Sequence, residues 1–470
     1  MKKMDKLKTG IKNFDNILSG GIPVYSLNII SGSPGSGKTI LVQNIIFNSA
    51  RDGLKSLYLT TISESQFKMV RHLQEFEFFS DDFLGDKFIY GDLGAVLRKQ
   101  GTEKVLAYLT EMIKKHQPNI LVIDSFKAIR DIFPDEKTFK AFVFDLAAAL
   151  SVWEVTVFLI GEYEEKELTQ LSEFAIADGI FHLYGQGEKR FQKRYLRILK
   201  MRGTHFEQGE HLFQISSAGI EVYPRIKPEG KGLQYEVRSG RKGFGITELD
   251  EMLSGGLKEG TITLISGGTG TGKTALALKF LLDGAEKGEK GLVLSFEEPV
   301  VQLIDNVRSL GWELDKYLAD GRLDIRFISP IELDVDKHAF EIMDMVGENR
   351  VDRLVIDSIS SFESSVIDLQ KYKDYLWALG QQLKRRHVTT IFTVLNEDLF
   401  SPVVVTKAQI SLMTDNIIIL RYVEDDSNVK KVLGILKARG TNHNKDFREY
   451  EITPNGINIL GKLDRANMLR

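Results

Sequence analysis

Hydrophobic and polar positions follow one repeating pattern, in which short apolar runs rich in β-branched residues alternate with longer amphipathic stretches. Continuous apolar runs of this length are typical of strands buried on both faces of a sheet. They predict strands over 27–31, 56–60, 120–124, 155–160, 262–266, 292–296, 353–357 and 388–395. The amphipathic stretches at 39–53 and 138–151 predict helices. Strands that alternate with helices predict an α/β fold, with a mostly parallel sheet covered by helices on both faces.

The chain repeats its own landmarks at a nearly constant spacing. "GIKNFDNILSGGIP" at 10–23 matches "GITELDEMLSGGLK" at 245–258, 235 positions later. "KMRGTH" at 200–205 matches "KARGTN" at 437–442, 237 positions later. Landmarks that recur in one order indicate a tandem domain duplication. We therefore predict three parts, a first domain over 1–225, a linker rich in Gly, Pro and charge over 226–240, and a second domain over 241–470.

Composition narrows the classes of function. The chain has 470 residues, of which 43% are hydrophobic and 27% charged, as in soluble globular proteins. It contains no apolar run of the ~18 residues that a membrane span needs and no apolar signal-peptide core at its start, so we expect a cytoplasmic protein. Cysteine is absent, which excludes disulfides, thiol catalysis and Cys-ligated zinc. The net charge of −3 argues against a protein that binds nucleic acid through a global basic field.

Each half carries one glycine-rich motif of the form G-x-x-x-x-G-K-T between a predicted strand and a predicted helix. In such a P-loop (Walker A motif), glycines let backbone N–H groups turn toward phosphates, at a helix N-terminus whose dipole favours anions. We expect the lysines to reach the β- and γ-phosphates of a nucleotide. The predicted phosphate cradles are Gly32, Ser33, Pro34, Gly35, Ser36, Gly37, Lys38 and Thr39, and Gly267, Gly268, Thr269, Gly270, Thr271, Gly272, Lys273 and Thr274.

Four side chains are expected to hold Mg²⁺. The hydroxyls of Thr39 and Thr274 end the two cradle motifs, and such a hydroxyl is a ligand of the nucleotide's metal in P-loop enzymes. Asp124 and Asp357 end apolar strands some 85 residues further on, where α/β sheets place their ligands. We predict that each aspartate holds the ion in the Walker-B role, rather than serving only as a helix cap.

Beyond the cradles, three further features occur in both halves: the "GI…LD…LSGG" entry, the "VIDS" strand end and the "KMRGT" or "KARGT" segment. With these features the chain resembles the KaiC family, two-domain ATPases of the RecA superfamily, over essentially its full length. The resemblance implies a RecA-like fold in each half, and ATP and Mg²⁺ as cofactors. It also implies a double-ring homohexamer with ATP bound between subunits.

In this family two adjacent glutamates after the second strand orient the water that attacks the γ-phosphate. The resemblance gives that role to Glu297 and Glu298, whereas the same distance beyond the first cradle leads to Ile62 and Ser63. Glu64 lies one position further on, and a shift of one residue at a strand end turns a side chain to the opposite face, so Glu64 could replace the pair only if the loop rearranges. We therefore expect the first domain to bind ATP and hydrolyse it slowly.

The resemblance also implies residues that act on a neighbouring subunit. Lys200 and Arg202, and in the second half Lys437 and Arg439, match a lysine and an arginine that reach the γ-phosphate held by the adjacent subunit. Alternation along a strand places both members of each pair on one face. An arginine supplied from outside makes hydrolysis depend on assembly. The alternative is a solvated basic strand edge.

Autophosphorylation is a further hypothesis. The clock proteins of the family modify an adjacent Ser–Thr pair, and here Ser411 matches the serine while Leu412 stands at the threonine. An ordered two-site cycle is therefore excluded, whereas phosphorylation of Ser411 with Glu297 as the base stays open. The alternative interpretation is a small polar residue near an interface.

Three classes of function remain. The first is a regulatory ATPase that assembles with itself and acts on regulatory protein partners that the sequence does not identify. The second is a DNA-handling recombinase or helicase motor on the same fold, which the acidic composition disfavours. The third is a nucleotide-gated scaffold with negligible turnover.

Overall fold

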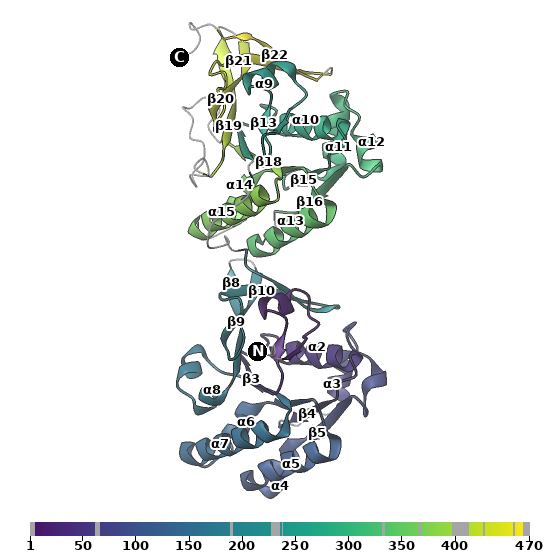
Figure 1. Ribbon diagram of the computed structural model, residues 1–470, viewed down its shortest axis with the longest axis vertical. Helices are drawn as coiled ribbons and strands as arrows, with labels where there is room; N and C mark the ends of the chain where they lie inside the picture. The colour runs from purple at the N-terminus through teal and green to yellow at the C-terminus, as the bar shows by residue number, and fades with distance from the viewer. Residues whose placement is uncertain are drawn as a thin grey trace. The chain divides into compact units, whose positions relative to one another are not determined.

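The chain divides into two compact units, Met1–Arg225 and Ile226–Arg470 (Figure 1). The computed structural model describes residues 5–61, 66–188, 191–226, 236, 238–330, 334–365, 369–396, 413–425, 428–454 and 456–463. Each unit is built around one nine-stranded sheet. Within the described part of the chain, no helix is long and apolar enough to cross a membrane.

The sheet of the first unit has the strand order β11-β10-β9-β8-β3-β7-β6-β4-β5, in which β8 to β5 run parallel and β9 to β11 antiparallel. The parallel strands are β8 (Gly179–Glu188), β3 (Leu27–Gly32), β7 (Thr156–Gly161), β6 (Ile120–Asp124), β4 (Ser56–Thr60) and β5 (Phe88–Asp92). The antiparallel strands are β9 (Phe191–Met201), β10 (Glu210–Ser216) and β11 (Gly219–Tyr223). A short ribbon, β1 (Lys6–Leu7) with β2 (Ile22–Pro23), precedes the sheet in the chain.

The helices of the first unit cover both faces of this sheet. They are α1 (Phe14–Ile17), α2 (Lys38–Arg51), α3 (Gln66–Leu73), α4 (Leu93–Gln100), α5 (Val105–His116), α6 (Phe126–Arg130), α7 (Glu136–Trp153) and α8 (Ser172–Ile176). Neighbouring residues of one strand enter different cores: Ile30 packs in the cluster with α2, and Ile29 in the cluster with α5 and α7. Since side chains alternate between the faces of a strand, a strand covered on both sides must be apolar throughout.

The second unit repeats this sheet strand for strand, in the order β16-β15-β17-β18-β14-β19-β20-β21-β22. Its parallel strands are β16 (Leu323–Phe327), β15 (Gly291–Ser295), β17 (Arg353–Asp357), β18 (Thr389–Leu395), β14 (Ile262–Gly267) and β19 (Asn416–Asp425). Its antiparallel strands are β20 (Asn428–Ala438), β21 (Arg448–Thr453) and β22 (Gly456–Lys462), and its entry ribbon is β12 (Arg241–Lys242) with β13 (Leu257–Lys258). The expected mostly parallel α/β sheet is thus confirmed in both halves.

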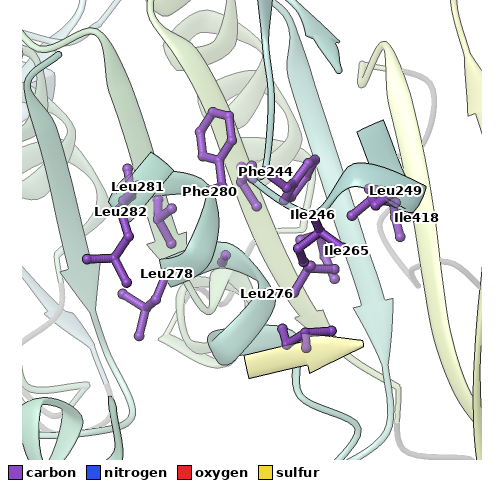
Figure 2. Close-up of a cluster of buried hydrophobic side chains, with 14 of the residues drawn as sticks. Phe244, Ile246, Leu249, Ile265, Leu276, Leu278, Phe280, Leu281, Leu282 and Ile418 are labelled. Carbon is purple, nitrogen blue, oxygen red and sulfur yellow. The ribbon is translucent and has the colours of Figure 1, made fainter. Parts of the chain in front are cut away.

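One core of the second unit shows how its cradle helix is held. The helices are α9 (Thr247–Met252), α10 (Lys273–Glu286), α11 (Val300–Ser309), α12 (Leu314–Ala319), α13 (Val335–Asn349), α14 (Ile359–Ser365) and α15 (Leu369–Arg385). Leu276 and Phe280 of α10 pack in one cluster with Phe244 and Ile265, the last from the strand that leads into the cradle (Figure 2). The Phe244 and Phe280 rings lie 5.4 Å apart between centroids. This packing fixes the start of α10 against the end of β14.

Candidate active sites at two phosphate cradles

Both cradles connect a buried strand to a helix whose first residue is the lysine. β3 ends at Gly32 and α2 begins at Lys38, and β14 ends at Gly267 and α10 begins at Lys273. A Cβ atom on Gly32 would lie 1.9 Å from the carbonyl oxygen of Leu183 on the neighbouring strand. Glycine is therefore required where the loop leaves the sheet. The loop then presents the N-terminus of a 14-residue helix, where free N–H groups and the helix dipole favour phosphate.

The two lysines fold back over their own loops. Lys38 Nζ donates to the carbonyl oxygen of Ser33 at 2.8 Å, and Lys273 Nζ donates to that of Gly268 at 2.9 Å. Burial lowers the pKa of both lysines below the usual value, and neighbouring carboxylates oppose this shift. A partly desolvated ammonium at the mouth of an anion site interacts more strongly with phosphate than one in water.

Threonine and aspartate meet in both units. Thr39 Oγ1 donates to Asp124 Oδ2 at 2.9 Å, and Thr274 Oγ1 donates to Asp357 Oδ2 at 2.7 Å. Sequence predicted these four residues, and the structure brings each pair together. In both units a cis peptide bond follows the aspartate. Burial raises the pKa of Asp357, although hydrogen bonds from Thr393 and Thr274 act in the opposite direction.

The oxygen ligands at each pair fit Mg²⁺. This ion prefers oxygen and is usually held by one or two carboxylates together with the phosphates of a substrate. Among the described residues no group of three or more His, Cys, Asp or Glu side chains could hold a metal alone. A metal at Thr39–Asp124 or Thr274–Asp357 would take its remaining ligands from water and phosphate oxygens.

The glutamate pair of the second unit lies at its cradle. Glu297 and Glu298 follow β15 and line a cavity of about 320 Å³ together with Lys273 and Thr274. Ser358 Oγ donates to Glu297 Oε1 at 2.6 Å. Asn306 Nδ2 of α11 donates to Glu298 Oε2 at 2.9 Å, and the Ser295 hydroxyl donates to the carbonyl oxygen of Glu298 at 2.7 Å. Both carboxylates are thus positioned by hydrogen bonds.

The register of the sheet shows which residues of the first unit correspond to this pair. Thr60 pairs with Asp124 as Ser295 pairs with Asp357. The N–H of Thr61 then donates to the Asp124 carbonyl at 2.9 Å, and the N–H of Phe296 to the Asp357 carbonyl at 2.7 Å. The two stretches therefore correspond residue by residue up to Thr61 and Phe296.

The next residues in the sequence are Ile62 and Ser63, against Glu297 and Glu298. Residues 62–65, which include Glu64, lie outside the described residues. The cavity of the first cradle has a volume of about 720 Å³, and its lining includes Lys38, Thr39 and Asp124.

Sequence reasoning did not find several side chains at these sites. Tyr58 donates its hydroxyl to Asp124 Oδ2 at 2.7 Å, and Thr393 donates to Asp357 Oδ1. Both residues lie in apolar strand runs, where the sequence does not distinguish a hydroxyl at a functional site from one buried in the core. Glu162, the first residue after β7, lines the first cavity. A strand end beside the cradle strand is the signal that could have identified it.

The basic pairs lie at the opposite end of the sheet from the cradles. Lys200 pairs with Ile180 on β8, and Ile180 pairs with Ile29 on β3, three residues before the Gly32 at which the cradle begins. Lys200 Nζ donates to the carbonyl oxygen of Ala175 at 3.2 Å, and Arg202 forms a 3.5 Å ion pair with Asp178. In both units the structure keeps the basic pair away from the cradle of its own chain.

The second unit matches this arrangement. Lys437 pairs with Ile417, which pairs with Leu264, three residues before Gly267. Lys437 Nζ donates to the carbonyl oxygen of Thr414 at 2.7 Å. Ser411, the candidate phosphorylation site, lies outside the described residues.

Comparison with known proteins agrees with this geometry. The family model described as "ATPase: KaiC" matches the chain twice, over residues 7–227 and 243–464. The chain belongs to the KaiC family of ATPases. Its two sheets are accordingly two tandem RecA-like domains, and membership of this ATPase family implies that the chain binds ATP.

Curated KaiC proteins match nearly the whole chain. The circadian clock protein KaiC3 of Synechocystis sp. is 29% identical over 97% of this chain and 92% of its own length. The circadian clock oscillator protein KaiC 1 of the same organism is 28% identical over 97% of this chain and 89% of its own. The circadian clock oscillator protein KaiC of Rippkaea orientalis is 29% identical over 97% of this chain and 88% of its own.

Proposed function

We propose that this KaiC-family chain is a Mg²⁺-dependent ATP phosphohydrolase in which the second unit carries most of the turnover. The observation that supports this proposal is the single cavity that Lys273, Thr274, Glu297 and Glu298 line together. A lysine for phosphate, a hydroxyl for the metal and a carboxylate for water are the groups that phosphoryl transfer to water requires.

The proposed mechanism assigns one task to each group. The N–H groups of the cradle and the ammonium of Lys273 bind and orient the β- and γ-phosphates. Glu297, oriented by the Ser358 hydroxyl, orients a water and accepts its proton as the water oxygen bonds to the γ-phosphorus. The bond from the γ-phosphorus to the bridging oxygen breaks, and ADP leaves with the electron pair. Mg²⁺, held at Thr274 and Asp357, would neutralise phosphate charge.

We propose that the first unit binds ATP through Lys38, Thr39 and Asp124 and hydrolyses it more slowly. The absence of the glutamate pair from positions 62 and 63 supports this difference. Nucleotide that stays bound stabilises the state that binds it, by mass action. We retain 226–240 as the linker between the domains, with domains over 1–225 and 241–470.

We propose a double-ring homohexamer with ATP between subunits. The register supports this because Lys437 lies three residues, about 10 Å at ~3.3 Å per residue, from the strand end that leads into its own cradle. Arg439 follows further away still, so a γ-phosphate would have to come from a neighbour. A contact of this head-to-tail kind closes into a ring.

The relatives named above are circadian clock proteins, and we do not carry the clock function over to this chain. We propose a regulatory ATPase of the cytoplasm whose output passes to protein partners. Phosphorylation of Ser411 is the accessory hypothesis. Intact mass before and after incubation with Mg²⁺ and ATP tests it, because a gain of one phosphate that Ser411→Ala removes would establish an autokinase.

Turnover of the full chain tests the main proposal. In the variant with Glu297→Gln and Glu298→Gln, the turnover of the second unit should fall by about 10²- to 10⁴-fold, and ATP binding should be kept. Light scattering of the same samples should give the mass of a hexamer. Unchanged turnover in this variant would contradict the proposal, and strong stimulation by single-stranded DNA with a steep salt dependence would favour the DNA motor instead.

A further inference from the structure

The end of β7 lies beside the first cradle. β7 lies between β3, which leads into the cradle, and β6, which ends at Asp124. Gly161 pairs with Ser31 on one side, and Ile160 pairs with Asp124 on the other. The next residue, Glu162, therefore leaves the sheet between the phosphate loop and the metal-binding aspartate. It lines the same cavity of about 720 Å³ as Lys38, Thr39 and Asp124.

Glu162 lies near enough to the cradle lysine for the two charges to interact. Among the charges that oppose the lowering of the Lys38 pKa by burial, Glu162 has a larger effect than Asp124. Glu162 is exposed, and within the described part of the chain no hydrogen bond to its carboxylate is present. The adjacent acidic residues are engaged elsewhere: Glu164 caps a short helix and Glu165 pairs with Arg197. Among the described residues, Glu162 is thus an acid that lines the cavity and has no hydrogen-bonding partner of its own.

The corresponding position of the second unit is apolar. Val394 pairs with Ser266 as Gly161 pairs with Ser31, so Leu395 corresponds to Glu162. Leu395 lines the second cavity, in which the carboxylates come from Glu297 and Glu298 instead. Each cavity is therefore lined by glutamate, but the glutamates follow different strands. In the first unit Glu162 follows β7, and in the second unit Glu297 and Glu298 follow β15.

We infer that Glu162 is a catalytic residue of the first cradle, where it orients the attacking water and accepts its proton. In this step the water oxygen bonds to the γ-phosphorus and the bond from phosphorus to the bridging oxygen of ADP breaks. The water proton passes to Glu162 and the electron pair leaves with ADP. This inference rests on the proposed ATP hydrolysis and assigns the slow turnover of the first unit to one side chain.

The first cradle can be measured in the full chain once the second is silenced. In the background Lys273→Ala, which has no working second cradle, the remaining turnover belongs to the first cradle. Adding Glu162→Gln should lower that turnover by at least about 100-fold, the usual contribution of a positioned general base. Binding of a fluorescent ATP analogue to the first cradle should stay within about twofold, because glutamine keeps the size of the side chain and Lys38 is untouched.

Two further variants separate chemistry from folding. Glu154→Gln changes an exposed glutamate just before the opposite end of β7 and should leave turnover of the background unchanged. Glu162→Asp keeps the carboxylate and should recover part of the lost turnover. Thermal unfolding of all variants should match, which ties any loss to the reaction.

The outcomes are distinct. Background turnover that survives Glu162→Gln overturns the inference and leaves the proposed ATPase intact. A background with bound ATP but no turnover also overturns it, because the first cradle then has no catalytic residue to identify. Wild-type protein that hydrolyses no ATP at either cradle removes the proposed function itself.

Discussion

The position of Arg439 predicts that each active second unit is shared between two subunits. Arg439 follows β20, and its N–H donates to the Asp415 carbonyl at 3.0 Å, at the end of the sheet opposite the cradle. Its side chain is 57% exposed, and its Nη1 lies 3.8 Å from Oδ1 of Asp415. Asp415 also pairs with Lys384 Nζ at 2.7 Å, so this buried carboxylate keeps a cation when the Arg439 side chain turns outward to a neighbour.

The experiment uses two variants that lose turnover for different reasons. Arg439→Ala keeps a complete cradle but offers no arginine, and Lys273→Ala offers the arginine but has no working cradle. An arginine supplied by a neighbour contributes about 10³-fold or more, which corresponds to about 4 kcal/mol of transition-state stabilisation. Each variant alone should therefore show almost no turnover from the second unit.

Mixed rings should regain activity. When the two variants are co-expressed in equal amounts and assemble at random, about a quarter of the interfaces join an intact cradle to an intact arginine. Turnover should rise to about a quarter of the wild-type value for the second unit. The assay is steady-state phosphate release by co-purified mixtures, with each parent measured at the same total concentration.

The controls decide between action on a neighbour and action within one chain. Arg326→Ala removes an exposed arginine that pairs with Asp324, and it should leave turnover unchanged. The double variant Arg439→Ala with Lys273→Ala, mixed with the Arg439→Ala parent, should recover nothing because no subunit supplies an arginine. If the mixture of the two single variants shows only the mean turnover of its two parents, the shared site is refuted, even where light scattering gives the mass of a hexamer.

The remaining predictions concern the metal and the charged core of the second unit. Asp357→Asn should raise the Mg²⁺ concentration for half-maximal turnover, since an amide is a weaker ligand than a carboxylate; an unchanged midpoint in a Mg²⁺ titration would contradict the metal role. Arg353 is 1% exposed and pairs with the buried Asp283 and the half-buried Glu289. Changing it to Ile should cost about 3 kcal/mol of unfolding free energy, the lower end for a broken buried pair, because Lys287 and Lys242 still pair with the two carboxylates. The triple variant Arg353→Ile, Asp283→Asn and Glu289→Leu carries the residues that the first unit has at these positions, Ile120, Asn48 and Leu54, and it should recover most of that loss in urea unfolding. No recovery would show that the uncharged arrangement of the first unit does not transfer to the second. Burial alone would raise the pKa of Glu289, but its hydrogen bonds and the nearby cations lower it, so the wild type should lose stability as pH falls below about 4.5 and the Arg353→Ile variant should lose less.

Strand positions could be predicted from the sequence because burial on both faces leaves a local signal. The runs at 27–31, 56–60 and 120–124 became β3, β4 and β6 with at most one residue of difference. Helix ends were less accurate: the helix predicted over 138–151 spans Glu136–Trp153, since Asp135 accepts a hydrogen bond from the Thr138 N–H and begins the helix earlier. Apolar periodicity does not record where such a cap lies.

The sites could be predicted in part. The cradles and the Thr–Asp pairs are read from motifs, because a phosphate loop needs particular residues at fixed spacing. Glu162 and Tyr58 carry no motif, and only the pairing of strands far apart in the sequence brings them to Lys38 and Asp124. Strand order depends on long-range contacts that a linear pattern does not contain, so the predicted chemistry of the first cradle lacked one acid.

If Glu162 and Glu297 act as proposed, the two units place their catalytic acids on different strands of the same fold. β6 is flanked by β4 and β7, and all three run parallel, so both neighbouring strand ends open toward the same cradle. An acid at either end lies near the γ-phosphate, and moving it from one end to the other leaves the glycine loop and the Thr–Asp pair unchanged. The ends differ in support, however: Glu297 accepts a hydrogen bond from Ser358, whereas Glu162 projects from an exposed position. A less constrained base orients water for a smaller fraction of the time, which agrees with the proposed slower hydrolysis at the first cradle.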